Sequence, residues 1–203
     1  LAYQAEVRPR NIYKIAHKYQ VDLLHGEIVA EFALNIFDSI KGQLHFWGDL
    51  EREYLWSATI LHNSGLYISH SAHHKHSYYL IRNSELLGFS EIEIELIAQI
   101  ARYHRKSKPK RKHETYASLS DYHRKMIKQL SAIMRLAIAL VRRQIGAIRE
   151  LECRYDSEYK QLHLHLYPTV KGDDCALELW NLDYKKPIFE QEYGVKILTT
   201  LHK

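Results

Sequence analysis

The sequence contains little cysteine and no long apolar run, and each shortage excludes a class of protein. Only two cysteines, Cys153 and Cys175, occur among 203 residues, and they do not form a Cys-x-x-Cys motif. This excludes a disulfide framework or a cysteine zinc site, and we expect a reducing, cytoplasmic location. Because no apolar run approaches the length of a bilayer span and no signal-peptide pattern opens the chain, we expect no membrane partner.

Glycine is also scarce, and this bears on phosphate chemistry. The 8 glycines are scattered, and none belongs to a Gly-x-Gly-x-x-Gly phosphate loop. The chain opens with Leu1-Ala2-Tyr3 instead of methionine, so we expect it to begin inside a longer protein. The formal net charge of +5 is a modest bias, which favours an anionic partner without naming one.

Helical periodicity dominates the chain to about residue 146 and predicts a mainly α fold. Asp22 either caps a helix or lies in its first turn, Asp49 is expected to cap another, and Ser90 with Glu93 forms a capping box. The first predicted helix begins at Pro9, and the next three cover about 24–40, 50–62 and 73–82. A fifth begins after Ser90, and a sixth covers 121–145.

From about residue 147 the pattern changes to short alternating segments, which predict a small α+β unit. Segments 149–155 and 161–167 are expected to form two strands, and the strict alternation of the second places His163 and His165 opposite the leucines. Such a histidine pair suits either a metal site or the solvent face of a sheet, and we favour the solvent face. Two short helices, 176–182 and 187–193, and a strand at 195–201 are expected to follow.

The stretch 60–81 concentrates histidine, since five of its residues are histidines flanked by aliphatic and aromatic side chains. Neither a surface loop nor a plain core has a reason to collect imidazoles, so the pattern predicts a polar pocket covered by helices. His25 lies four residues before Val29 on a predicted helix and therefore points toward the same core. From the residues alone it would be a buried, hydrogen-bonded histidine.

These motifs resemble a known family. His62-Asn63 stands where an HD-type phosphohydrolase domain carries its His-Asp pair, and segments 73–89 and 101–106 look like the C-terminal half of exopolyphosphatases. From about Arg8 to about Arg143 the chain resembles the exopolyphosphatase / guanosine pentaphosphate phosphohydrolase family. The resemblance implies an HD-domain-like helical bundle over residues 1–146, followed by a small C-terminal domain over 147–203.

The resemblance also implies a degenerate HD pocket. His25 and His62 match the first two metal-binding histidines of HD domains, and the later candidates are His73, His74, His76 and His104. The two aspartates do not match, because Asn63 replaces one and Ile138, which also fits an apolar core stripe, replaces the other. A divalent cation needs anionic oxygen beside imidazole. We therefore expect no metal and no catalytic residue here, and a pocket that favours anions.

A basic run lies beside this pocket, since seven of the residues from Arg102 to Lys112 are lysine or arginine and none is acidic. The usual fate of such a run is a solvated loop. Lys75, Arg102, Arg105 and Lys106 belong to elements that carry the candidate histidines, and we predict that they bind polyphosphate. The remaining lysines are expected to form a solvated approach.

Two classes of function remain open. In the first, the chain is the C-terminal domain of an exopolyphosphatase, and it binds inorganic polyphosphate or guanosine pentaphosphate for an N-terminal actin-like domain. That domain would supply catalysis and Mg²⁺, and the resemblance also implies a homodimer. The second is an autonomous metal-dependent HD phosphohydrolase acting on a nucleotide. Nucleic-acid binding ranks last, because nothing resembles a nucleic-acid module.

Overall fold

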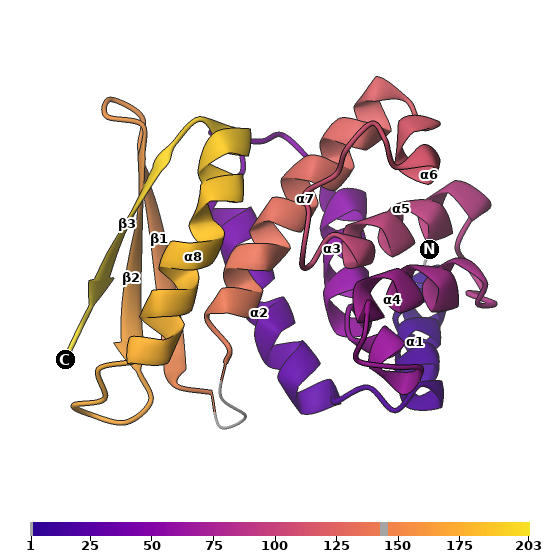
Figure 1. The fold of residues 1–203 in the computed structure, drawn as a ribbon, viewed down its shortest axis with the longest axis horizontal. Helices are drawn as coiled ribbons and strands as arrows, with labels where there is room; N and C mark the ends of the chain where they lie inside the picture. The colour runs from indigo at the N-terminus through magenta and orange to yellow at the C-terminus, as the bar shows by residue number, and fades with distance from the viewer. Residues whose placement is uncertain (1, 143–145) are drawn as a thin grey trace.

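Helices build most of the fold, and a small sheet closes its C-terminal end (Figure 1). The computed structural model describes residues 2–142 and 146–203. The helical part comprises α1 (Ala2–Lys18), α2 (Leu23–Ile40), α3 (Asp49–Leu61), the 3-10 turn η1 (Ser64–Tyr67), α4 (His73–Arg82), α5 (Glu91–Arg102), α6 (Glu114–Ala117) and α7 (Asp121–Ala139). The C-terminal part comprises β1 (Ile148–Asp156), β2 (Gln161–Pro168), α8 (Ala176–Tyr193) and β3 (Lys196–Leu201). The predicted mainly α fold with a small α+β unit is confirmed.

Capping contacts explain where the helices that carry the histidines begin. Asp22 caps α2, since its carboxylate accepts the backbone N–H of His25 at 3.1 Å. Ser90 and Glu93 form the predicted capping box of α5. Helix α4 covers residues 73–82, as predicted. These starts place His25 and His73 in the first turns of their helices.

Helix α1 does not begin at Pro9, contrary to the sequence prediction. Pro9 lies inside the helix, seven residues after its first residue. A proline removes one backbone hydrogen bond, but the helix continues through it here because the turn before it is anchored. The Arg8 guanidinium pairs with the carboxylates of Glu53 and Glu93, which come from α3 and α5.

Two details of α2 and α3 also differ from expectation. The helical spacing of the apolar residues in 24–40 predicts that Leu24 lies on the buried face of α2, but its side chain is 68% exposed because it lies in the first turn, beyond the reach of the core. Gly48, and not Asp49, precedes α3 as its cap. The reason is the Glu51 carboxylate, which accepts the Gly48 N–H at 3.1 Å and so starts the helix one residue earlier.

The last helix of the helical part is shorter than the periodicity predicts. Helix α7 ends at Ala139, and the predicted end, Ile145, lies outside the described residues. The N–H groups of Leu140 and Val141 bond to carbonyls three residues back, at 3.2 and 3.1 Å. Such tightened contacts close the last turn of a helix.

Helix α8 is one continuous helix, although two short ones were predicted. Pro187 lies inside it and suggested a break. Leu182 and Phe189, seven residues apart and therefore on one face, are both buried. The burial of that face along α7 holds the helix together across the proline (Figure 1).

The sheet has the order β1-β2-β3, with β1 and β2 antiparallel and β2 and β3 parallel, joined through α8. The leucines of β2 face the helices and are buried, and β1 contacts α2 through the Asn35 amide, which donates to the Leu151 carbonyl at 2.8 Å. His163 and His165 lie on the opposite face, as predicted, with ring centroids 4.2 Å apart.

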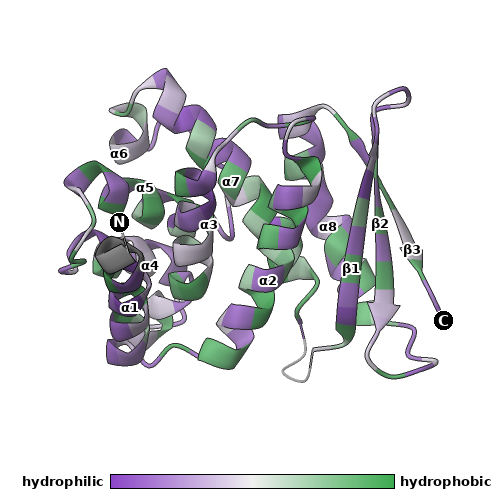
Figure 2. Cartoon of the chain, turned by 180° about the vertical axis from the view of Figure 1, so that it is seen from behind, coloured by the Kyte–Doolittle hydropathy of each residue, from purple (hydrophilic) through white to green (hydrophobic). Residues whose placement is uncertain are grey.

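The two parts of the chain share one buried apolar cluster that extends from Ile12 in α1 to Ile197 in β3. Whether residues 1–146 and 147–203 are separate domains stays a prediction. Hydrophilic and hydrophobic residues are mixed along α2 and α7 (Figure 2). Among the described residues, no helix combines the length and the apolar character that a bilayer span requires.

Candidate functional site

A cavity of about 830 Å³ lies where α2, α3, α4, α7 and α8 meet. One wall consists of imidazoles, which we call the histidine wall and define as His25, His62, His70, His73 and His104. The facing residues belong to α7, to the segment after it and to α8. The cavity therefore joins the helical part to the C-terminal unit.

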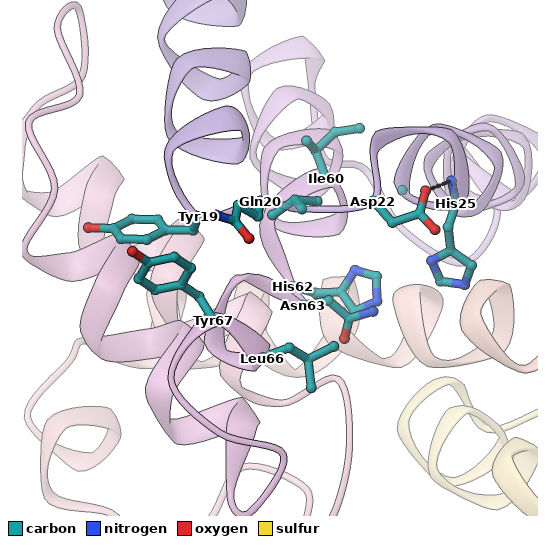
Figure 3. A pocket seen from close by; sticks show the side chains of 11 residues that line it. Tyr19, Gln20, Asp22, His25, Ile60, His62, Asn63, Leu66 and Tyr67 are labelled. Carbon is teal, nitrogen blue, oxygen red and sulfur yellow. Dashed lines mark hydrogen bonds between the residues drawn. The ribbon is translucent and has the colours of Figure 1, made fainter.

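A smaller pocket of about 350 Å³ adjoins this cavity and shares His25, His62, Asn63 and Leu66 with it. In Figure 3 the rings of Tyr19 and Tyr67 lie on one side of this pocket and His25 lies on the other, with His62 and Asn63 between. The shared residues make the two hollows continuous.

Glycine at position 65 permits the close approach that forms the histidine wall. A Cβ there would lie 2.0 Å from the His73 carbonyl oxygen and 2.5 Å from the Ser77 nitrogen, closer than any side chain allows. The Ser77 hydroxyl accepts the Gly65 N–H at 2.9 Å and donates to the His62 carbonyl at 2.6 Å. These contacts hold the end of α3 against the start of α4.

His62 and His104 occupy equivalent places, each just beyond the C-terminal end of a helix. The His62 Nδ1–H donates to the Thr59 carbonyl, and the His104 Nδ1–H donates to the Ala101 carbonyl, each three residues back. His104 lies two residues beyond the end of α5 at Arg102. In both residues the Nδ1 bond turns the other ring nitrogen, Nε2, away from the helix backbone.

A directed chain of hydrogen bonds crosses the wall from Arg105. A guanidinium only donates, so Arg105 donates from Nη1 to His73 Nδ1 at 2.7 Å. His73 then donates from Nε2 to His104 Nε2 at 3.1 Å, and His104 donates to its backbone acceptor. This assignment needs one proton on each imidazole.

The surroundings keep these imidazoles neutral. Burial lowers the pKa of His62 to about 4 and that of His104 well below its ordinary value. Burial also lowers the pKa of His73, and the neighbouring Arg105 charge contributes in the same direction. At neutral pH His62, His73 and His104 therefore offer hydrogen bonds without charge.

The cavity also carries fixed positive charge, which we call the cationic cluster: Arg105 and Lys106 from the loop after α5, and Arg135, Arg142 and Lys185 from the facing side. Four of the five line the cavity itself, and Lys106 lines an adjoining hollow of about 330 Å³ with Arg105, Arg135 and Lys185. Within the part of the chain that the structure describes, none of the five forms an ion pair with a carboxylate.

Arg135 holds the loop that carries two members of this cluster. Its Nε donates to the Tyr103 carbonyl at 2.7 Å, and its Nη2 donates to the carbonyls of Lys106 and Ser107 at 2.8 and 3.0 Å. Burial lowers the pKa of the guanidinium to about 10, so it stays charged at neutral pH. Burial also lowers the pKa of Lys185, and Arg135 is the largest of the charges that add to this effect.

The structure brings together most of the predicted pocket residues. His25, His62, Asn63, His73 and His104 all line the cavity. His74 and His76, half-buried on α4, are not among its lining residues. His74 Nδ1 is buried without a hydrogen-bond partner.

The predicted polyphosphate-binding residues divide in the same way. Arg105 lines the cavity and Lys106 the adjoining hollow, whereas Lys75 is exposed on α4 and lines neither. The Arg102 guanidinium lies over the rings of Tyr78 and Tyr103, 6.0 and 5.3 Å from their centroids. The binding role of all four stays a prediction.

Sequence reasoning missed Arg135, Arg142 and Lys185. Arg135 could have been recognised, because it is the one charged residue in the apolar run 133–139, where a buried basic side chain needs a specific partner. Lys185 could not, because its position depends on how α8 packs along α7.

Ile138 packs against the buried core, as its place in the apolar stripe predicts, but it also borders the cavity. The side chain is half-buried and lines the cavity, together with Asn63. Both positions that the resemblance to HD domains assigns to carboxylates therefore line the same cavity as the histidines, and no described lining residue is an aspartate or glutamate. Nor do the described residues contain a group of three or more His, Cys, Asp or Glu arranged to hold a metal. With cations opposite, this lining fits a divalent ion poorly.

The comparison with protein families agrees with the earlier resemblance and extends it. Residues 7–186 match the family described as Ppx/GppA phosphatase, domain III. The match passes the limit near Arg143 suggested by the motifs and includes β1, β2 and most of α8. The walls of the cavity thus lie within the matched region, and the chain belongs to the Ppx/GppA phosphatase family through its domain III.

Proposed function

We propose that this chain binds inorganic polyphosphate or guanosine pentaphosphate and presents it to an actin-like, Mg²⁺-dependent catalytic domain of the same protein. Hydrolysis of the phosphoanhydride bond belongs to that other domain. One observation carries the proposal: the cationic cluster converges on a cavity whose described lining holds no carboxylate.

The electrostatics favour a phosphate ligand. Like charges that converge repel one another; the pKa of Lys185 is lowered mainly by burial, and Arg135, Arg142, Arg105 and Lys106 add to this effect. A polyanion relieves this repulsion, and arginine grips phosphate oxygens with two parallel donors while lysine acts as a point charge. Arg105 is suited to this role because its Nη1 is already fixed by His73.

The histidine wall complements the cations in this proposal. HD domains use such imidazoles to hold metal ions, and we infer that this pocket has kept the histidines for phosphate. A neutral imidazole can donate to a phosphate oxygen, and a nearby anion raises its pKa, so it can take up a proton when the ligand binds. Binding should therefore strengthen as the pH falls toward 6.

A charge-matched pair of variants tests the proposal. Arg105→Ala/Lys185→Ala removes two charges from the cavity, whereas Lys110→Ala/Lys112→Ala removes two from exposed positions that do not line it. We expect the first pair to weaken tripolyphosphate binding at least about tenfold, since hydrogen bonds to charged groups are worth ~1.5–3 kcal/mol each. The control should lose far less, and binding should weaken with salt.

Titration calorimetry at two salt concentrations measures both effects, with tripolyphosphate and long-chain polyphosphate as ligands. Equal losses in the two double variants would mean that only general charge attracts polyanions, and the cavity would lose its assignment.

A further inference from the structure

The outer face of the sheet carries a second group of histidines, apart from the histidine wall. His163 and His165 alternate with the buried leucines of β2, so they point away from the helices, which lie on the other side of the sheet in Figure 1. His202 follows β3, and its backbone N–H continues the ladder by donating to the Leu166 carbonyl at 2.9 Å. Hydrogen-bonded neighbouring segments therefore hold three imidazoles close together on one face.

One pair among these imidazoles faces the right way to share a metal ion. The rings of His163 and His165 are stacked, 18° from parallel with centroids 4.2 Å apart, so their nitrogen lone pairs, which lie in the ring planes, do not converge. The Nε2 atom of His163 is hydrogen-bonded instead to the Thr200 hydroxyl at 2.7 Å. In contrast, His165 Nδ1 and His202 Nε2 lie 2.9 Å apart and share a hydrogen bond.

A metal ion can replace the proton that this pair shares. Two nitrogens bound to one ion at about 2.0–2.1 Å, in square or tetrahedral geometry, lie about 2.9–3.4 Å apart. The pair is therefore already at ligand spacing, and the rings need only tilt outward to direct both lone pairs at one ion. Ligation requires a neutral imidazole, and burial lowers the pKa of His165, with His163 and His202 contributing in the same direction.

A carboxylate from the third strand lies beside this pair. Glu152 of β1 is directly opposite His165 in the antiparallel register, and such partners have Cβ atoms about 4.5–5.5 Å apart on the same face. The Glu152 carboxylate accepts from Arg154 Nε at 2.6 Å, and this hydrogen bond and the Arg154 charge lower its pKa, so it is ionised. Arg154 holds it away from the imidazoles, and the described residues accordingly contain no assembled set of three ligands. A change of rotamer in this partly exposed side chain supplies the third.

We propose that the outer face of the sheet binds a transition-metal ion such as Zn²⁺, with His165 Nδ1, His202 Nε2 and the Glu152 carboxylate as ligands. Two imidazoles, a carboxylate and a water molecule form a ligand set that Zn²⁺ accepts. The three ligands come from β1, from β2 and from the residue after β3, so the ion fastens the three strands together. The site lies apart from the cavity and does not depend on the proposed function.

Titration calorimetry of the full chain with Zn²⁺, in a buffer that does not chelate metals, tests the site. We expect one equivalent to bind, and His165→Ala and His202→Ala each to weaken the binding at least about tenfold. Arg154→Ala should strengthen it, because this change frees the Glu152 carboxylate and removes a positive charge beside the ion. Mg²⁺ should not compete, since it prefers an all-oxygen shell.

His163→Ala is the matched control, because it removes an imidazole from the same strand and the same face that is not a ligand in the proposal. It should change the affinity little. Hydrogen exchange provides a second readout: Zn²⁺ should slow the exchange of the β3 amides in the unaltered chain and not in His202→Ala. Circular dichroism checks that each variant folds.

Three results would overturn the site. If Zn²⁺ does not bind, the pair is only a hydrogen bond on a solvent-facing sheet. If Zn²⁺ binds but His165→Ala and His202→Ala leave its affinity unchanged, the ion is held elsewhere. If His163→Ala costs as much as His202→Ala, the clustered imidazoles attract the ion without the assigned ligand pair.

Discussion

The two sides of the cavity differ in chemistry and in origin. The histidine wall comes mostly from the ends of α2, α3, α4 and α5, and burial lowers the pKa of its His62, His73 and His104, which are therefore neutral at pH 7. The facing side comes from α7, the segment after it and α8; it carries Arg135, Arg142 and Lys185 and is flanked by exposed aromatic rings. One side can change its charge with pH and the other cannot. A ligand bound between them therefore meets one adjustable surface and one fixed surface.

The largest expected effect follows from breaking the histidine wall at Gly65. Gly65→Ala places a Cβ against the backbone of α4, so the end of α3 must move away from His73. We expect a loss of about 3 kcal/mol in the free energy of unfolding, measured by urea denaturation. Gly26→Ala, where the nearest atom would lie 3.5 Å away, is the control and should cost little. Similar losses in both variants would contradict the close-approach argument.

The next effect concerns pH and distinguishes the two sides directly. The pKa of His62 is about 4 in the folded protein against an ordinary 6.5, so the unfolded chain binds the proton more tightly. The stability that depends on neutral His62 is complete above pH 6.5 and is lost as the pH falls toward 4. A shift of this size is worth about 3 kcal/mol at its limit.

His62→Asn removes this titration while its amide keeps a donor for the Thr59 carbonyl. Its stability should fall less than that of the unaltered chain between pH 7 and 4, as urea unfolding at several pH values would measure. Some decline remains, because the neighbouring His104 and His73 also have lowered pKa values, and His25 and Arg105 face the same cavity. Parallel pH profiles of the two proteins would contradict the prediction.

A third, smaller effect concerns the link between the two sides. Arg135→Met, on the facing side, removes three hydrogen bonds to the 103–107 loop, which carries His104 and Arg105 beside the histidine wall. The buried charge is itself unfavourable, so the net loss should be only about 1–3 kcal/mol. Hydrogen exchange should increase at the loop amides, while those of the β1–β2 pair remain protected. Unchanged exchange in the loop would show that Arg135 does not hold it.

The two sides of the cavity also differ in how well they could be predicted from the sequence. The histidine wall was predictable because His25, His62 and His104 each lie near a helix end, where a cap or an apolar periodicity fixes their direction. The family motifs added the expectation that these ends meet. The role of Gly65, which allows these ends to meet, could not be predicted, because its close contact with the backbone of α4 is a tertiary contact that no local pattern reveals.

The charged side could not be predicted because it depends on packing between distant segments. Trp180 and Lys185 reach the cavity because α8 packs along α7 with Leu182 and Phe189 buried, an arrangement that joins segments distant in sequence. The low helix propensity of Pro187 favours a break in α8, but the helix stays continuous because residues on both sides of the proline are buried. For the same reason Lys75, which belongs to the histidine-rich stretch, was placed at the site although it lies on the exposed face of α4.

The last prediction is that the chain alone has no phosphohydrolase activity. The chain should release no phosphate from polyphosphate or GTP with Mg²⁺ or Mn²⁺ present, because Asn63 and Ile138 supply no anionic oxygen and the cationic cluster repels a cation. Asn63→Asp/Ile138→Asp places two carboxylates beside His25 and His62, and it should create weak Mn²⁺ binding that calorimetry can detect. Adding Arg105→Ala should strengthen that binding, since one opposing charge is gone. If the unaltered chain instead binds one equivalent of metal and releases phosphate, and His62→Ala abolishes that release, the histidine wall is catalytic and the chain is an autonomous phosphohydrolase.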